Sequence, residues 1–135
     1  MIKVKLVVVK GSDIILGHIN EDGTIYRSQA GLNDRIGRVD LSSGKVYEDQ
    51  FGPDKKVGHV NMKNGKVYSS RLGLDKHLGN VNGKGHMLRL VHMGIDTYVG
   101  MADPFVSYAH TGGAMLLLVI PALEGPSANK TAKQS

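Results

Sequence analysis

The 135-residue chain contains no cysteine and no tryptophan, and aromatic residues make up only 5% of it. Without cysteine there are no disulfide bonds and no thiolate metal ligands, and an oxidising compartment offers the chain no advantage. We therefore expect a cytoplasmic protein. A chain of this length is also the size of one domain with one core.

Long apolar runs are scarce as well. The N-terminal run from Leu6 to Val9 is shorter than the apolar core of a signal peptide, which has about 7 to 15 residues. The apolar segment at 105–120 is shorter than the roughly 20 residues of a membrane-spanning helix, so we expect no membrane span. The net charge of +5 permits contact with a polyanion without requiring it.

Glycine, in contrast, is plentiful, with 18 residues, and many of them recur at a fixed spacing. Five segments begin and end with glycine, with Asp or Asn two residues after the first glycine and an aliphatic residue before the second. Successive segments start 20 or 21 residues apart, which indicates one short supersecondary unit copied along the chain. The segments span 11–17, 31–37, 52–58, 73–79 and 94–100.

The stretches between these segments predict four β-hairpins, because each has two short β-type runs joined by a turn that ends in glycine. Asp22-Gly23 suits a two-residue type I′ turn, whereas Gly44 and Gly65 suit type I turns closed by a glycine bulge. Counting from these turns predicts that an aliphatic residue faces a tyrosine in three hairpins. The predicted pairs are Ile19 with Tyr26, Val39 with Tyr47 and Val60 with Tyr68.

Half-hairpins remain at both ends of the repeat, at 4–10 and at 101–103. Pairing these end strands closes the set into a ring and removes exposed sheet edges. We therefore predict an all-β fold with one C-terminal helix or apolar segment, a closed radial array of about five repeats and about ten short strands. An open meander is the alternative. The domain should span 1–123, and 124–135 should form a flexible polar tail.

The apolar segment at 104–120 is expected to pack in or on the ring. Asp103 at an N-cap followed by Pro104 predicts the start of a helix, and Pro121 predicts its end. Gly112 and Gly113 weaken a helix, so they mark a kink, a close approach, or the end of a shorter helix before a strand at 115–120. A helix that is apolar on all sides must be covered, by the ring or by an oligomer interface.

Four glycine-punctuated hairpins around an apolar C-terminal segment resemble the four-fold β-flower domain, a small bacterial family. The resemblance covers residues 1–123 and rests on the repeated strings Gly-x-Val-Asn/Asp and Gly-Lys-Val-Tyr. It implies the fold, but it implies no activity and no functional residues. The same strings also resemble PRC-barrel sheets, which lack this repeat period.

Stacked repeats place equivalent side chains in rings, and one ring holds candidate ligand-binding residues. His18, Arg38, His59 and Asn80 each follow the second glycine of a segment. Such a ring, if it pointed inward, would bind a metal or an anion at the mouth. Arg38 would repel a cation, and the histidines follow no metal-ligand spacing. We therefore predict no metal and no cofactor, and we favour ordinary half-buried side chains.

Basic residues at three successive corners are candidates for binding nucleic acid or another polyanion: Arg35, Lys55, Lys56 and Lys76. No aromatic residue is interleaved with them to stack bases, so we favour solvated corners and consider nucleic acid an unlikely partner. The end corners at 14–15 and 97–98 carry less charge, which indicates that the helix or a partner chain covers them.

Asp and Asn form two further rings of oxygens, of the kind that suits a hard cation such as calcium. Because Asp and Asn beside glycine usually bond their own backbone, we favour turn caps for both rings. The first ring contains Asn20, Asp40, Asn61, Asn82 and Asp103, and the second contains Asp13, Asn33, Asp54, Asp75 and Asp96.

The sequence contains no nucleophile elbow, no phosphate loop and no metal triad, so nothing in it identifies an enzyme. We expect a non-catalytic β-repeat module that binds a protein partner, or a second copy of itself, through its corners or mouth. The first alternative is a polyanion-binding module that uses the basic corners. The second is a small-ligand or metal site at the ring mouth.

Overall fold

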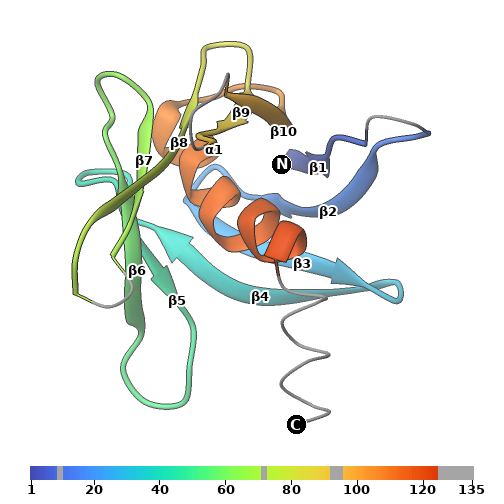
Figure 1. Ribbon diagram of the computed structural model, residues 1–135. Helices are drawn as coiled ribbons and strands as arrows, with labels where there is room; N and C mark the ends of the chain where they lie inside the picture. The colour runs from blue at the N-terminus through green and yellow to red at the C-terminus, as the bar shows by residue number, and fades with distance from the viewer. Residues whose placement is uncertain (9–10, 71–72, 92–95, 125–135) are drawn as a thin grey trace, which may run out of the picture.

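The computed structural model describes residues 1–8, 11–70, 73–91 and 96–124 (Figure 1). Within these ranges the chain forms ten strands and one C-terminal helix. The strands are β1 Ile2–Leu6, β2 Ile14–Ile19, β3 Thr24–Gln29, β4 Leu32–Val39, β5 Lys45–Glu48, β6 Lys55–Val60, β7 Lys66–Ser69, β8 Lys76–Val81, β9 His86–Arg89 and β10 Thr97–Asp103. The helix consists of α1 Tyr108–Ala114 and the π-helical η1 Met115–Val119, and helical turns continue to Glu124.

The strands form one closed antiparallel barrel in chain order, and β1 and β10 pair to close it. Lys3 lies opposite Asp103 and Leu6 lies opposite Gly100 at the closure. This confirms the predicted all-β fold with a C-terminal helix and rejects the open meander. Of the predicted tail at 124–135, Glu124 belongs to the last helical turn, and 125–135 lie outside the described residues.

Because consecutive strands are neighbours, their connections alternate between the two ends of the barrel. Tight turns after β2, β4, β6 and β8 lie at one end, which we call the turn face. The loops after β1, β3, β5, β7 and β9 lie at the other end, and we call them the corner loops. Figure 1 shows the hairpins that carry several corner loops splaying outward around the C-terminal end of the helix.

The cross-strand register differs from the predicted one by one residue. In the first hairpin His18 lies opposite Tyr26, whereas Ile19 lies opposite Ile25. The next two hairpins repeat this arrangement: Arg38 faces Tyr47 and Val39 faces Val46, while His59 faces Tyr68 and Val60 faces Val67.

In the first hairpin, the conformation of the turn explains the error in register. The predicted type I′ turn needs positive φ at Asp22 as well as Gly23, but only Gly23 has it, at 95°. Gly23 N–H donates to Asn20 O, and Asn20 N–H donates to Thr24 O, so the loop is wider than two residues. The prediction that glycine closes the second and third turns is confirmed, because Gly44 and Gly65 each have a φ of 80°.

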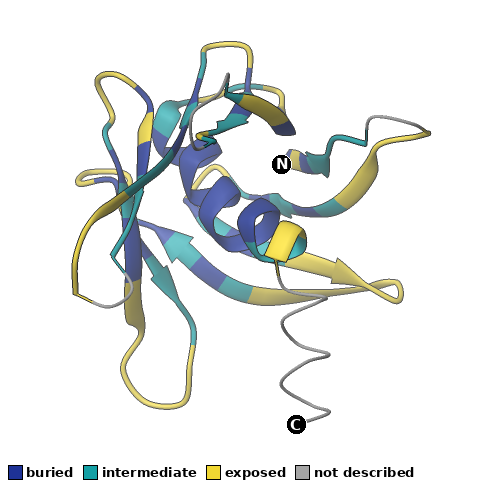
Figure 2. Ribbon diagram, viewed as in Figure 1, coloured by how far each residue is buried: buried dark blue, intermediate teal, exposed yellow. Residues whose placement is uncertain are grey.

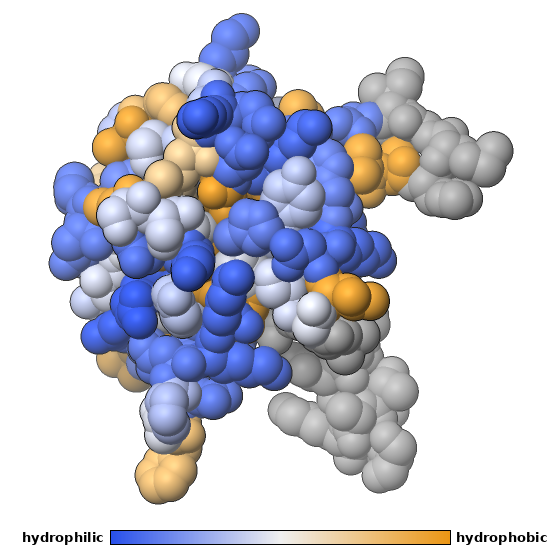
Figure 3. All heavy atoms as spheres, turned by 90° about the vertical axis from the view of Figure 1, so that its left-hand side faces the viewer, coloured by the Kyte–Doolittle hydropathy of each residue, from blue (hydrophilic) through white to orange (hydrophobic). Residues whose placement is uncertain are grey.

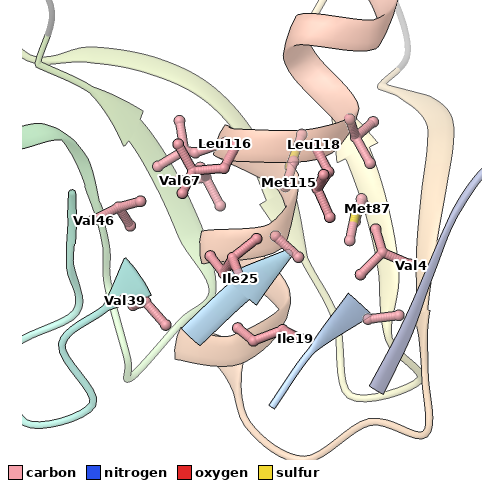
Figure 4. Packing of buried hydrophobic residues seen from close by; sticks show 14 of the residues in the cluster. Val4, Ile19, Ile25, Val39, Val46, Val67, Met87, Met115, Leu116 and Leu118 are labelled. Carbon is pink, nitrogen blue, oxygen red and sulfur yellow. The ribbon is translucent and has the colours of Figure 1, made fainter. Parts of the chain in front are cut away.

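Alternate strand residues point into the barrel and pack around the helix, as Figure 4 shows for Ile25, Val46 and Val67 against Leu116 and Met115. The helix is buried almost throughout, while the ends of the hairpins are exposed (Figure 2). The apolar segment, which was expected in or on the ring, thus packs inside the barrel. No helix within the described ranges has the length and apolar character needed to cross a bilayer.

The helix begins later than predicted and continues past its predicted end. Asp103 belongs to β10, and Ser107 is the N-cap, with its Oγ accepting the backbone N–H of His110. Ile120 N–H donates to Met115 O, five residues back, and helical turns continue through Pro121. The π-helical hydrogen bonds of η1 thus lie just before Pro121, which has no backbone N–H to donate. A helix therefore replaces the alternative strand at 115–120.

Gly112 and Gly113 mark a close approach between the helix and the barrel wall, one of the three predicted readings. A Cβ atom on Gly112 would lie 2.5 Å from Val60 Cγ2, and one on Gly113 would lie 2.8 Å from Val39 Cβ. Only residues without a side chain fit at these two positions, so the glycines set the depth at which the helix sits in the barrel.

Candidate functional site

The corner loops and the adjoining strand ends expose apolar side chains around one end of the barrel. Phe51 in the β5–β6 loop is fully exposed, Leu74 in the β7–β8 loop is 79% exposed, and Leu32 at the β3–β4 loop is 67% exposed. We call this surface the corner face, and its exposed apolar residues are Ile14, Ile15, Leu32, Phe51, Leu74 and Leu90. The wall beside it, over β6–β8, is mostly hydrophilic (Figure 3).

The helix does not cover the end corners, contrary to one of the two expectations. Ile14 is 50% exposed, Ile15 is 54% exposed and Tyr98 is 40% exposed. The C-terminal end of the helix does lie at this end of the barrel, since Arg89 Nη2 at the end of β9 contacts Glu124 Oε2 at 2.7 Å. Cover by a partner remains as the other expectation.

The predicted ligand-binding ring lies on the outer wall and does not converge at a mouth. His18, Arg38, His59 and Asn80 each lie between two buried residues of a strand, so strand alternation directs them outward. A metal or anion site would require these four side chains to point inward, and they point outward instead. Within the described ranges, no group of three His, Asp or Glu residues is placed to hold a metal ion.

Three of these outward residues stack on tyrosines. The ring centroids of His18 and Tyr26 are 4.8 Å apart, and those of His59 and Tyr68 are 4.7 Å apart. Arg38 Cζ lies 4.2 Å from the centroid of the Tyr47 ring, which is a cation–π distance. Asn80 faces Leu88 instead.

The next strand supplies a basic residue or histidine opposite the other side of each tyrosine. We call the resulting rows of cross-strand partners the tyrosine ladders: His18–Tyr26–Arg35, Arg38–Tyr47–Lys56 and His59–Tyr68–His77. The ladders thus bring two sets of candidate residues together on the outer wall. His18, Arg38 and His59 come from the predicted ligand-binding ring, and Arg35 and Lys56 come from the predicted polyanion-binding set. Because neighbours flank each ring in these ladders, the tyrosines do not form the open stacking platforms that single-stranded nucleic acid needs.

Carboxylates of the corner loops turn toward this outer wall. Asp54 Oδ2 lies 3.5 Å from Arg38 Nε, Asp75 Oδ2 lies 3.9 Å from His59 Nδ1, and Asp96 Oδ2 accepts from Asn80 Nδ2 at 3.2 Å. For these three positions of the second oxygen ring, the side chains reach across to another segment instead of only capping their own turn.

The turn-cap interpretation of the first oxygen ring is confirmed at three positions. Oδ1 of Asp40, Asn61 and Asn82 accepts the backbone N–H two residues later in each case. Hydrogen bonds from the Ser42 hydroxyl and backbone N–H lower the pKa of Asp40, and those from Thr24 lower the pKa of Asp22. Both carboxylates therefore serve as charged turn caps.

The four predicted polyanion-binding residues are not equally free. Arg35 Nε is held by Asp49 Oδ2 at 3.2 Å. Within the described part of the chain, Lys55, Lys56 and Lys76 take part in no ion pair. Lys55 begins β6 four residues after Phe51, and Lys76 begins β8 two residues after Leu74. Both lysines are exposed.

A hollow of about 250 Å³ lies on the corner side of the barrel between β3, β4 and β5. Two arginines and two carboxylates line it above an apolar floor. The lining residues are Arg27, Arg35, Ile36, Glu48, Asp49 and Leu117. It is the nearest feature to the predicted mouth site, but it contains none of the four residues predicted for that site.

His110 has a structural role that the sequence pattern did not indicate. It is 5% exposed, and its Nε2 donates to Glu21 O in the β2–β3 turn at 2.8 Å. Its Nδ1 is 2.7 Å from Ser107 Oγ. Since Nε2 must carry the proton to donate, the Ser107 hydroxyl donates to Nδ1 in the neutral ring. His110 thus attaches the start of the helix to the turn face.

Ile14 and Ile15 were identified from the sequence as a corner, but Leu32, Phe51 and Leu74 were missed, although a signal was present. Leu32 and Leu74 directly follow the first glycine of their segments, and Phe51 directly precedes one. Aligning the repeats by these glycines places each apolar residue at a turn, where a core role is excluded. Arg27 and Glu48, which line the hollow, likewise follow the equivalent residues Tyr26 and Tyr47.

No protein-family model, curated protein or solved structure matches the chain. The resemblance to the β-flower family therefore stays a prediction. The functional argument rests on the geometry of the barrel and its surfaces.

Proposed function

We propose that this protein is a non-catalytic binding module that contacts its partner through the corner face. The observation that carries the proposal is the exposure of apolar side chains at the corners, with Phe51 fully exposed and Leu74 79% exposed. These side chains contribute nothing to the core of the barrel. Covering one side chain of this size contributes about 1.5–3 kcal/mol, so several together would stabilise a complex.

The filled interior of the barrel supports a surface site. Met115, Leu117 and Val119 occupy the centre and are each at most 2% exposed. A barrel whose interior holds a helix leaves its ends and outer wall for binding. Among the described residues, the three most exposed large apolar side chains, Leu32, Phe51 and Leu74, all lie on the corner face. This face also carries lysines that have no ion partner in the described ranges.

Binding of a polyanion remains the first alternative, and the same lysines favour it. Arg35 is engaged by Asp49, however, and the tyrosines are flanked by their ladder neighbours. Binding to an anion through lysines alone would weaken steeply as salt increases. Binding through apolar corner residues would weaken far less, so a salt titration separates the two.

A small-ligand site remains the second alternative, with the hollow beside Leu117 in its favour. Arg27 would meet an anionic group there, and Glu48 and Asp49 would meet a cationic one. Such a ligand would be small and would carry both charges. The outward histidines would have no part in it.

Site-specific photo-crosslinking in living cells tests the proposal. A photoreactive phenylalanine analogue replaces Phe51 or Leu74 on the corner face, and Leu41 or Met62 on the turn face as matched controls, because all four are exposed. We expect adducts mainly from the two corner positions, whatever the class of partner. Equal or stronger crosslinking from the turn face would reject the corner face as the contact surface.

The proposal includes a cytoplasmic location, since a chain without cysteine gains nothing from an oxidising compartment. It also includes membership of the β-flower family, which the glycine-punctuated hairpins and the central apolar segment favour. A protein partner, including a second copy of this chain, is one class of binding partner that the corner face would accept.

A further inference from the structure

We propose that the partner of the corner face is the surface of an anionic lipid bilayer, into which the apolar corner residues insert. This inference rests on the proposed function, because it uses the same surface. It adds the chemical class of the partner. Three features of the corner face support it: the separation of the apolar residues, the free lysines beside them, and the engagement of the neighbouring carboxylates.

The three most exposed apolar residues of the corner face lie on separate hairpins. Leu32, Phe51 and Leu74 belong to three different corner loops, and Figure 1 shows the hairpins splaying apart. A stable protein interface usually requires a continuous packed core. A bilayer imposes no such requirement, because each apolar side chain can enter the boundary between headgroups and acyl chains independently.

The lysines of these loops are placed to contact lipid phosphates. Lys55 and Lys56 follow Phe51 within the same hairpin, and Lys76 follows Leu74 by two residues. None of the three lysines forms an ion pair within the described ranges. A lysine near an anionic leaflet contributes roughly fivefold in binding, since each is worth about 1 kcal/mol.

Most carboxylates of the corner loops are bound by neighbouring residues. Asp49 pairs with Arg35, Asp54 with Arg38, Asp75 with His59, and Asp96 accepts from Asn80. Asp13 accepts from the backbone N–H of Val8. Two of these carboxylates thus pair with arginines and the others accept hydrogen bonds or face a histidine, whereas the three lysines are left for a negatively charged partner.

The same charges disfavour a second copy of this chain as the partner. A two-fold interface through the corner face sets the same residues of both copies against each other. Lysines that have no carboxylate partner in one copy would then approach lysines in the other. Like charges brought together at an interface weaken it, whereas a phosphate surface complements them.

Vesicle co-sedimentation of the full chain tests the inference. The probes are vesicles of phosphatidylcholine mixed with phosphatidylglycerol, and vesicles of phosphatidylcholine alone. We expect binding to the mixed vesicles, and we expect Phe51→Ser with Leu74→Ser to weaken it by about tenfold or more for each residue removed. Replacing Lys55, Lys56 and Lys76 with Gln should weaken it by roughly a hundredfold or more in total.

Matched variants on the turn face serve as controls. Leu41→Ser with Met62→Ser removes two exposed apolar side chains there, and Lys45→Gln with Lys66→Gln removes two exposed charges. Both controls should bind the mixed vesicles as the unchanged protein does. All substituted positions are at the surface, so equal thermal unfolding temperatures would establish that every variant folds.

Four results would overturn the lipid proposal. The first is that the protein sediments with neither vesicle, and the second is that the variant with Phe51→Ser and Leu74→Ser binds the mixed vesicles as before. The third is that the turn-face controls lose as much vesicle binding as the corner variants. The fourth is that the protein binds a single-stranded oligonucleotide and still does so after the apolar residues are removed. Light scattering then tests the underlying function. Self-association that the same corner variant abolishes would reject the bilayer but retain the corner face, whereas preferential crosslinking from the turn face would reject both.

Discussion

At the residue scale, the helix is held in the barrel by very few polar contacts. His110 bonds to the β2–β3 turn and to Ser107, which places the first turn of the helix. The neighbouring Thr111 is fully buried, and its Oγ1 has no hydrogen-bond partner among the described residues. A buried hydroxyl without a partner costs about 1–3 kcal/mol, so Thr111 weakens the fold at this point.

We expect Thr111→Val to stabilise the protein by about 1 kcal/mol, because it removes the buried hydroxyl while keeping a β-branched side chain of similar shape. The free energy of unfolding, measured with a chemical denaturant, checks this expectation. Thr111→Ser is the matched control. It keeps the hydroxyl and loses a buried methyl group, so it should destabilise the protein. A less stable Thr111→Val variant would show that the hydroxyl has a partner.

At the element scale, the depth of the helix depends on the two glycines that meet the barrel wall. Gly112 contacts Val60 of β6 and Gly113 contacts Val39 of β4. Alanine is normally preferred to glycine within a helix by about 1 kcal/mol. The contact with valine reverses this preference, because a methyl group at Gly112 would fall 2.5 Å from Val60 Cγ2.

We expect Gly112→Ala to destabilise the protein by about 1–2 kcal/mol, since the cost of overpacking exceeds the gain in helix propensity. Val60→Ala in the same chain should recover part of the loss, so the two changes should be less than additive in denaturant unfolding. Gly83→Ala is the control, because a Cβ atom there would meet nothing within 4 Å. Strict additivity of the first two changes would contradict the proposed contact.

The elements also show which parts of the fold were predictable. Closure of the barrel followed from the two half-hairpins, since unpaired edges at both ends have one simple solution. The register of the first hairpin did not follow, because it depends on whether Asp22 adopts positive φ, and its Oδ1 instead accepts the backbone N–H of Thr24. The start of the helix was misplaced because Asp103 serves as the last residue of β10, a tertiary pairing with Lys3 that local sequence does not reveal.

At the scale of the whole molecule, the two ends of the barrel differ. The turn face is closed by tight turns and by the His110 contact, and its apolar residues Leu41 and Met62 are only 38% and 39% exposed. On the corner face, Leu32, Phe51 and Leu74 are exposed by 67% or more. The candidate ring of His18, Arg38 and His59 was found from the sequence, but its outward direction required the register. Leu32, Phe51 and Leu74 were missed because a single apolar residue beside a turn glycine does not form the alternating pattern that marks a strand.

The central claim is that the helix is the core of the closed barrel, which leaves binding to the outside of the molecule. Native-state hydrogen exchange resolved to single amides tests this claim most directly. Amides from Met115 to Ile120 should exchange only through global unfolding, at the same free energy as the slowest amides of β4 and β6. Exchange of these helix amides at a free energy well below that of the strands would contradict the account.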